Sequence, residues 1–225
     1  MNLAHIFASR THATRPAPPG LLIALVAAAL TVLAGSALAQ NWNEAGDAGN
    51  MVFGAQQTSG AGALTTINGN LHSAGDVDMF CIRVTDPANF RAYLNCVIHQ
   101  ENHLFLFNGA SMGLTHNDGC AAGQSSIGAP LVPTIGTYYL AVGGWGALAI
   151  NGPSNQLWTF SAGNPIVGQR APDGPGAGLP LNLWAGGNLS VIGTNYTVHL
   201  VGAAFCNATT PVGARTWGNI RSIYR

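Results

Sequence analysis

The sequence predicts an all-β fold: an antiparallel, jelly-roll-like β-sandwich, built as a single domain after a cleaved signal peptide. Three observations lead to this expectation. About seven short segments alternate apolar and polar residues or are rich in β-branched and aromatic residues. Gly, Asn, Asp and Pro separate these segments at turns. No segment has the apolar spacing of a long amphipathic helix.

The segment that anchors the prediction is residues 78–84, where successive side chains face opposite sides of a strand. The expected core face is Phe80, Ile82 and Val84, and the expected partly exposed face is Met79, Cys81 and Arg83. Residues 104–107 are apolar throughout, which predicts burial on both faces. The other strands are expected at residues 65–71 (with a break at Gly69), 90–98, 113–116, 137–142 and 196–203.

Residues 1–39 are predicted to be a secretory signal peptide. Arg10 and Arg15 supply a basic start, residues 21–33 an apolar run, and residues 37–39 a small-residue cleavage site. The apolar run is short for a membrane span, and no later segment is long and apolar enough to be one. The chain is therefore expected to be secreted, in the extracellular space or at the cell surface.

The exported part divides into three predicted stretches. Residues 40–63 form a Gly-rich lead-in, and residues 64–206 form the sandwich. The sandwich contains an irregular Trp-, Gly- and Pro-rich insert at residues 143–187. Residues 207–225 form a C-terminal tail whose apolar residues fit one short helix, either as a sorting or docking tail or as a turn that packs on the sandwich.

The charge pattern excludes one class of partner. All 8 acidic residues but only 6 of the 8 basic residues follow residue 39, so the formal charge of the exported part is 6 − 8 = −2. A weakly acidic chain without a basic run does not fit nucleic-acid binding. The expected partner is an unidentified extracellular protein or polysaccharide.

The four cysteines, Cys81, Cys96, Cys120 and Cys206, all lie in the exported part, which favours two disulfides. Four cysteines allow three pairings. Alternation places Cys81 and Cys96 on opposite faces of neighbouring strands, which disfavours that pair. We favour Cys96–Cys120, with unpaired buried thiols as the alternative.

Two carboxylates, Asp76 and Asp78, precede the anchoring strand and point the same way in an extended chain. Like charges this close repel unless a cation or other group separates them. Calcium binds carboxylate and carbonyl oxygens in such loops, so both residues are candidate calcium ligands. Alternatively they are solvated residues that keep a strand edge soluble, since neither common calcium-loop motif is present.

Histidines and aromatic residues supply the other candidates. His99 and His103 flank Glu101, a pattern that fits either a metal site or a polar loop. Trp145 and Trp184 lie among glycines and are candidate exposed ligand-binding side chains for a sugar ring or a peptide. The sequence has no G-x-S-x-G motif and no phosphate-binding loop, so we expect a protein that is not an enzyme.

Four short motifs in order resemble the bacterial pre-peptidase C-terminal domain family of secreted proteins. They are residues 75–80 (GDVDMF), 104–109 (LFLFNG), 117–118 (ND) and 136–142 (GTYYLAV), within about residues 64–203. The resemblance implies a jelly-roll-like sandwich that accompanies exported enzymes without being catalytic. Some members bind calcium or a polymeric substrate.

The resemblance adds Asp118, in the acidic loop, to the candidate calcium ligands. It implies a secreted, non-catalytic module for binding or cell-surface interaction, stabilised by calcium. The alternative is an accessory, polysaccharide- or protein-binding partner of a secreted hydrolase. Two departures weigh against simple transfer of the family's role: the chain shows no protease domain, and the 143–187 insert is longer than the fold needs.

Overall fold

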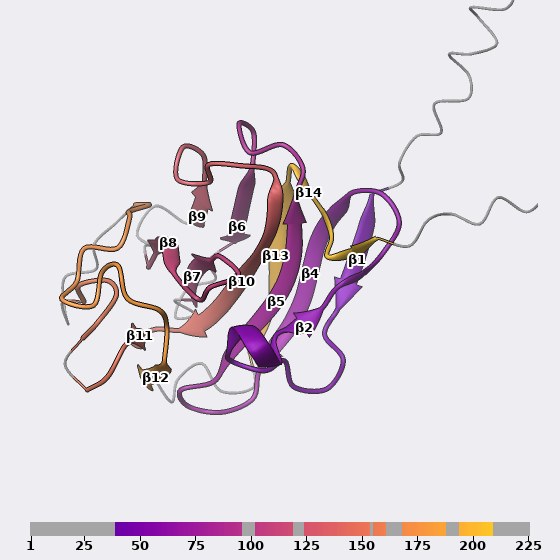
Figure 1. Cartoon of the computed structure of the whole chain (residues 1–225). Coiled ribbons are helices and arrows are strands. Elements are labelled where there is room, and N and C mark those ends of the chain that lie inside the picture. The colour runs from indigo at the N-terminus through magenta and orange to yellow at the C-terminus, as the bar shows by residue number, and fades with distance from the viewer. Residues whose placement is uncertain are drawn as a thin grey trace, which may run out of the picture. The chain divides into compact units, whose positions relative to one another are not determined.

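The computed structural model describes residues 39–95, 102–118, 124–153, 155–160, 168–187 and 194–208. These residues belong to one compact unit, residues 37–225, and form an all-β sandwich in which two sheets enclose a shared core (Figure 1). One turn of 3-10 helix, η1 (Val52–Gly54), accompanies the strands. The predicted fold class is confirmed. No helix among the described residues is both long and apolar enough to span a membrane.

The first sheet has five strands. In spatial order they are β1 (Gln40–Asn43), β4 (Leu64–Leu71), β13 (Thr194–Val201), β6 (Arg91–Asn95) and β9 (Gln124–Gly128). β1 runs parallel to β4, and the other pairs are antiparallel. This pairing brings segments from both ends of the described chain side by side.

The second sheet has six strands and is organised around the predicted anchoring segment, β5. Its spatial order is β14 (Ala203–Phe205), β5 (Val77–Val84), β10 (Gly136–Gly144), β7 (Asn102–Phe107) and β8 (Gly113–Asn117), and β2 (Gln56–Gln57) also pairs with β5. β10 lies antiparallel between β5 and β7. The strands expected at 78–84, 104–107, 113–116 and 137–142 therefore all belong to this sheet.

Two stretches outside the predicted strands, the Gly-rich lead-in and the irregular insert, contain short strands. The lead-in contributes β1, β2 and β3 (Ser59–Gly60), and β3 pairs with β15 (Asn207–Ala208) at the start of the predicted tail. The insert contains a two-stranded ribbon of β11 (Ala147–Ile150) and β12 (Leu183–Gly186). Both stretches lacked a clear sequence signal because their strands are short and obtain hydrogen bonds from distant partners.

The main core fills the space between the two sheets, and its side chains come from alternate positions of both. β5 contributes Phe80, Ile82 and Val84, as predicted from alternation. β4 and β13 contribute from the opposite sheet, with Ile67 and Val198 fully buried. β4 continues through Gly69, so the expected break is absent from this strand.

A second core covers the outer face of the six-stranded sheet. It is formed by Val77, Met79, Phe105, Phe107, Ala141, Ala147, Ala149, Leu157, Trp158, Leu181 and Ala55. Because of this cover, Met79 is buried. Cys81 is also buried, in a disulfide with Cys206 and beside β2, so the expectation of a partly exposed face holds only for Arg83. The prediction was wrong because alternation cannot reveal that a distant insert will pack on the second face. β7 is buried on both faces, as expected.

A disulfide joins Cys81 of β5 to Cys206, which follows β14, with a Cα–Cα distance of 5.5 Å. The disfavoured Cys81–Cys96 pair is therefore absent. Cys96 and Cys120 lie outside the described residues, so their pairing stays a prediction.

Three other predicted features lie outside the described residues. They are residues 1–38 of the signal peptide, tail residues 209–225, and His99 and Glu101 of the His99–Glu101–His103 pattern.

Candidate metal centre

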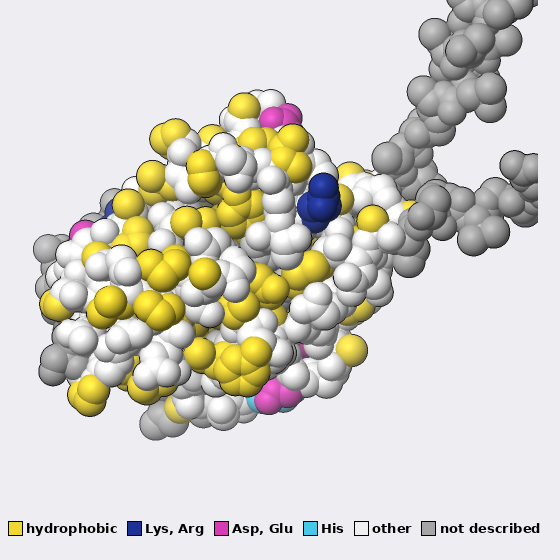
Figure 2. Space-filling model, viewed as in Figure 1, with side chains coloured by type: hydrophobic (Ala, Val, Ile, Leu, Met, Phe, Trp, Pro, Cys, Tyr) yellow, Lys and Arg dark blue, Asp and Glu magenta, His cyan; other side chains and the backbone are white. Residues whose placement is uncertain are grey.

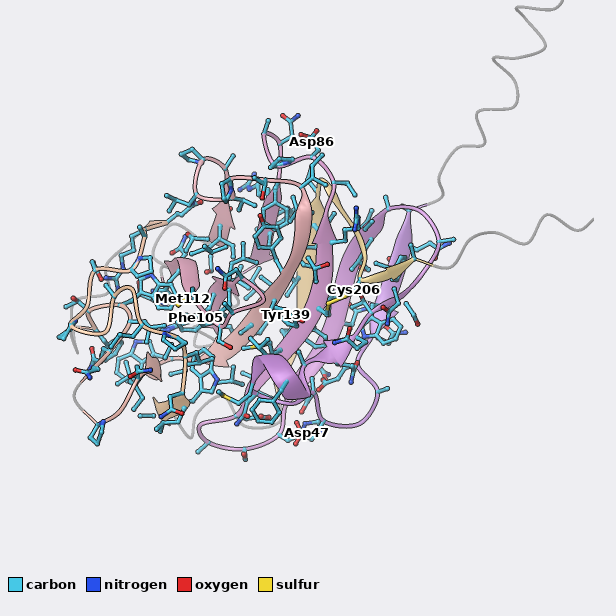
Figure 3. All side chains as sticks on the ribbon, in the orientation of Figure 1. Asp47, Asp86, Phe105, Met112, Tyr139 and Cys206 are labelled. Atoms are coloured by element: carbon cyan, nitrogen blue, oxygen red, sulfur yellow. A yellow bond between two sulfur atoms is a disulfide. The ribbon has the colours of Figure 1, made fainter. Side chains whose placement is uncertain are left out.

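Carboxylates from two segments and a histidine from a third gather at one end of the sandwich. Glu44 and Asp47 follow β1, and His72 follows β4. Asp76 immediately precedes β5, and Asp78 is the second residue of that strand. Asp47 lies at the lower edge of the view, at the opposite end from Asp86 (Figure 3). Figure 2 shows acidic side chains beside a histidine at the same edge, on a face that carries few other charges.

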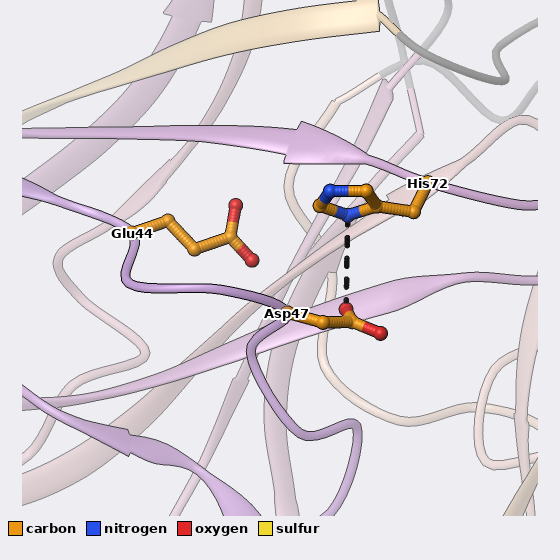
Figure 4. Close-up of side chains that lie close together, drawn as sticks. All are labelled: Glu44, Asp47 and His72. Atoms are coloured by element: carbon orange, nitrogen blue, oxygen red, sulfur yellow. Dashed lines mark ion pairs between the residues drawn. The ribbon is translucent and has the colours of Figure 1, made fainter.

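Asp76 and Asp78 point to the same place, as predicted, and Asp47 joins them. One ligand oxygen from each of the three lies within 4.8 Å of the others. A second group with the same spacing consists of Glu44, Asp47 and His72 (Figure 4). No signal in the sequence pointed to Asp47, because it reaches the cluster only through the pairing of β1 with β4 and the turn that follows.

Asp78 is the unusual member of the cluster because it is fully buried, with a relative exposure of 0%. Alternation along β5 directs it inward, on the same side as Phe80 and the main core. Its Oδ2 accepts a hydrogen bond of 2.6 Å from the hydroxyl of Tyr196 in the opposite sheet. Within the described part of the chain, its Oδ1 has no hydrogen-bond partner.

Gly69 makes room for the hydrogen bond between Tyr196 and Asp78, which joins the two sheets. It pairs with Tyr196 across β4 and β13. A Cβ atom at residue 69 would collide with the Tyr196 hydroxyl and lie 2.8 Å from Oε2 of Glu44. The residue expected to interrupt β4 therefore provides the space through which Tyr196 reaches Asp78.

The environment raises the pKa of Asp78 to about 8. Burial is the main cause because it disfavours the charged carboxylate. The hydrogen bond from Tyr196 partly offsets it, and the negative charges of Glu44, Asp76 and Asp47 raise the pKa further. Near neutral pH the carboxyl is therefore held as the neutral acid unless a cation compensates its charge.

Glu44 has a structural role within the cluster. Its Oε1 accepts a 2.7 Å hydrogen bond from the backbone N–H of Ala48. Its Oε2 accepts a 2.8 Å bond from the backbone N–H of Asn70. The carboxylate thus fastens the turn after β1 to β4.

His72 and Asp76 close the other side. The backbone N–H of His72 donates to Oδ2 of Asp76 at 2.5 Å. The imidazole Nδ1 lies 3.8 Å from Oδ1 of Asp47 and 3.9 Å from Oδ2 of Asp76. Both contacts are half exposed or more on the histidine side, so they contribute little to stability.

An open depression of about 420 Å³ lies beside the cluster on the five-stranded sheet. Side chains with amide and hydroxyl groups line much of it: Asn43, Asn68, Asn70, Asn195, Tyr196 and Thr197. Glu44 and His72 form its border with the carboxylates. The depression therefore offers hydrogen-bond donors and acceptors next to a strongly acidic edge.

Asp118, the third predicted calcium ligand, does not join this cluster. The strand register of the second sheet runs from Asp78 to Val142, Leu104 and Asn117. Three strand spacings of about 4.8 Å therefore separate Asp78 from the end of β8, where Asp118 is buried. The motif order of the resemblance could not reveal this separation, because β10 inserts between β5 and β7.

The two tryptophans proposed as ligand-binding side chains are both partly buried. The indole N–H of Trp184 donates to the backbone oxygen of Asn50 at 2.6 Å. Its ring meets Phe105 and Phe107 edge-on, with centroids 4.9 and 6.0 Å apart. Trp145 meets Phe160 edge-on at 5.8 Å. Trp184 thus closes the second core, in which Trp158 is 3% exposed.

Comparison of the sequence with protein-family models gave no match, and comparison with curated proteins gave none.

Proposed function

We propose that this chain is an exported, non-catalytic β-sandwich module for binding or cell-surface interaction, stabilised by calcium at Asp47, Asp76 and Asp78. One observation carries the calcium part of the proposal. Asp78 is a fully buried carboxyl, one oxygen of which has no hydrogen-bond partner in the described part of the chain, and it has a ligand oxygen within 4.8 Å of those of two other carboxylates. The motif resemblance to the pre-peptidase C-terminal domain family supports the same function.

A buried carboxyl can be accommodated either by a proton or by a cation. Three carboxylates in close contact repel one another strongly without compensation. Calcium suits this arrangement because it takes 6–8 oxygen ligands in flexible geometry. The three aspartates would supply the charged ligands, with water or backbone carbonyls completing the shell.

Calcium at this position would act on the structure of the sandwich. Asp78 reaches the five-stranded sheet through Tyr196, and Asp47 belongs to the segment after β1. One ion would therefore join both sheets and the lead-in at one end of the domain. The non-catalytic role rests on the sequence, which lacks the nucleophile and phosphate-loop motifs of common enzymes.

A second candidate, an accessory polysaccharide-binding partner of a secreted hydrolase, is favoured by the depression beside the cluster. Its amide and hydroxyl side chains are uncharged groups of the kind that hydrogen-bond sugar hydroxyls. Retention on insoluble polysaccharides, compared with retention after Asn70→Ala and Asn195→Ala, would test this candidate separately from calcium.

The calcium proposal is tested by chemical unfolding of the exported protein between pH 5 and 9, with calcium or with chelator. The folded-state pKa of Asp78 is about 8, against a usual value of 3.8. Between these two pKa values the folded state keeps a proton on Asp78 that the unfolded state has lost. The free energy of unfolding therefore falls as pH rises toward 8, at a limiting slope of about 1.4 kcal/mol per pH unit. Calcium should reverse this loss, with a larger stabilisation at pH 8 than at pH 5.

Two variants make the test specific. Asp78→Asn should remove both the pH dependence and the calcium response, because the amide carries no titratable charge. Asp86→Asn is the matched control at the other end of the domain, and it should retain both. A wild-type protein whose stability is the same in calcium and in chelator at pH 8 would show that Asp78 is a protonated core carboxyl, and would overturn the calcium proposal.

A further inference from the structure

The outer face of the five-stranded sheet carries a continuous row of uncharged polar side chains. Along β13 the buried residues are Tyr196, Val198 and Leu200, so the residues between them face outward. The outward side chains of β4, β13 and β6 lie beside one another in register: Asn68, Asn70, Asn195, Thr197, His199 and Tyr93. Arg91 and Val201 end the row, and among the described outward residues of these three strands Arg91 alone has a permanent charge.

Hydrogen bonds within the row fix its amide groups. Nδ2 of Asn68 donates to Oδ1 of Asn43 on β1, and the hydroxyl of Thr197 donates to Oδ1 of Asn68, each at 2.8 Å. Nδ2 of Asn70 donates to Oδ1 of Asn195 at 2.9 Å. A side-chain amide has two N–H donors, and within the described part of the chain those of Asn43 and Asn195 donate to no protein group. The row therefore presents oriented donors at fixed positions.

An aromatic pair continues the row toward the other end of the face. The rings of Tyr93 and His199 stack with centroids 4.9 Å apart. The guanidinium of Arg91 lies 4.9 Å from the centroid of Tyr93, and its Nε donates to the hydroxyl of Ser126 at 2.9 Å. These contacts fix the ring of Tyr93, whose hydroxyl has no hydrogen-bond partner among the described residues. The hydroxyl is therefore a further oriented polar group that a ligand can reach.

Two depressions lie at opposite ends of this face. The first, of about 420 Å³, is the one beside the carboxylate cluster, and Asn195 near the start of β13 lines it. The second, of about 320 Å³, is lined by Arg91 and Ser126. Arg91 pairs with Val201 at the end of β13, six residues beyond Asn195, which corresponds to about 20 Å along the strand. A ligand that reaches both depressions is therefore an extended molecule.

We propose that this face binds a linear, uncharged polysaccharide that lies along β13 and reaches both depressions. The inference rests on the second candidate function, the polysaccharide-binding role, and adds the class of ligand and the extent of the site. Sugar hydroxyls donate and accept hydrogen bonds, as the amide and hydroxyl groups of the row do. An uncharged chain suits the row because its amides offer no charge to pair.

Other macromolecules fit the face less well. A protein interface is centred on aromatic or apolar anchors that enter pockets of the partner, whereas here the rings of Tyr93 and His199 stack on each other. Nucleic acid needs several basic groups for its phosphates, and the described outward residues of the three strands supply Arg91 alone. Polar groups that are already oriented lower the entropic cost of binding a hydroxyl-rich chain.

The shape of the face favours one kind of linkage between the sugars. A β-1,4-linked chain, as in cellulose or chitin, is straight and ribbon-like, whereas α-1,4-linked starch coils. The row follows a single strand, β13, from one depression to the other. A straight chain therefore keeps its successive hydroxyls within reach of the row.

The competing explanation is that the amides only hydrate an exposed surface, in which case no matrix would retain the protein. The test measures retention of the exported protein on amorphous cellulose and on chitin, with starch and the acidic polysaccharide pectin for comparison. We expect retention on cellulose or chitin and none on starch or pectin. The soluble hexasaccharide of the retained polymer should bind at least about tenfold more tightly than its disaccharide, because only the longer chain reaches from Asn195 to Tyr93.

Variants at the two ends of the row test its extent. Tyr93→Phe removes one hydroxyl and keeps the stack on His199, so it should weaken hexasaccharide binding about three- to tenfold. Asn195→Ala acts at the opposite end and should weaken it at least as much. Arg83→Ala changes an exposed side chain of the other sheet, and this matched control should leave binding unchanged.

The inference is overturned, and the second candidate function survives, if Asn195→Ala abolishes binding while Tyr93→Phe and Tyr93→Ala bind the hexasaccharide as tightly as the wild type. Equal binding of disaccharide and hexasaccharide would have the same meaning. Equal retention on starch or pectin would show that the class of ligand is wrong. Retention on none of the matrices would overturn the inference and the second candidate together, while the calcium response of stability would still decide the calcium proposal.

Discussion

The outer faces of the two sheets differ in what covers them. The outer face of the six-stranded sheet lies under the second core, which the insert and the lead-in provide. The outer face of the five-stranded sheet carries no such cover among the described residues, and its side chains are amides, hydroxyls and a few rings. Strands of the six-stranded sheet are therefore buried on both faces, whereas strands of the five-stranded sheet are buried only on the face toward the main core.

On the open face, polar side chains bond to one another across strands. Nδ2 of Asn68 donates to Oδ1 of Asn43 at 2.8 Å, and Nδ2 of Asn70 donates to Oδ1 of Asn195 at 2.9 Å. The hydroxyl of Thr197 donates to Oδ1 of Asn68 at 2.8 Å. This ladder keeps the face hydrated and ordered without apolar contact.

On the covered face, contacts between aromatic rings take the place of these hydrogen bonds. Phe105 meets Trp158 and Trp184 edge-on, at 5.6 and 4.9 Å between centroids. Phe107 meets the same two rings at 5.7 and 6.0 Å. The comparison teaches that the second core, although made partly from an irregular insert, is packed like an interior.

The largest loss of stability is expected from a substitution on the covered face. Phe105→Ala should lower the free energy of unfolding by about 3–5 kcal/mol, because it removes a fully buried ring and leaves a cavity. Leu106→Ala, on the opposite face of the same strand, should cost about 2–5 kcal/mol. Denaturant unfolding measures both. A loss below about 1 kcal/mol for Phe105→Ala alone would show that the second core is only loosely packed.

The next largest loss of stability is expected from removing the disulfide on β5. Cys81 and Cys206 are 125 residues apart in sequence, so their disulfide constrains a long loop of the unfolded chain. Its removal in a Cys81→Ala, Cys206→Ala double variant should destabilise the protein by about 2–5 kcal/mol. Equilibrium unfolding of this variant against the oxidised wild type gives the value.

Peptide mapping without reduction checks the pairing itself. It should recover a Cys81–Cys206 peptide and, by our prediction, a Cys96–Cys120 peptide. Free thiols at Cys96 and Cys120 would refute the second pair and leave the first unaffected.

The smallest effect is expected on the open face. Asn68→Ala removes two side-chain hydrogen bonds on a half-buried, hydrated ladder, so it should cost about 1 kcal/mol or less. Asn89→Ala, which removes an exposed bond to Asp86 in a turn, is the matched control. A loss of several kcal/mol for Asn68→Ala would show that the ladder contributes as much as the covered core and would remove the contrast between the two faces.

The sequence by itself determined the fold class and most of the strands, because alternation and turn residues are local signals. It also placed Asp76 and Asp78 on one side of the chain, since their spacing matches the period of a strand. It further indicated the lead-in and insert as regions apart from the regular strands.

Only the tertiary structure decided which distant residues meet. Asp47 joins Asp76 and Asp78 through the pairing of β1 with β4. Asp118 lies far from this cluster because β10 inserts between β5 and β7. Tyr196 reaches Asp78 across the sandwich because Gly69 leaves room, and His116 reaches His103 because β7 and β8 pair antiparallel. These contacts depend on register and sheet order, which are set by the summed packing of the whole chain and leave no trace in the local pattern.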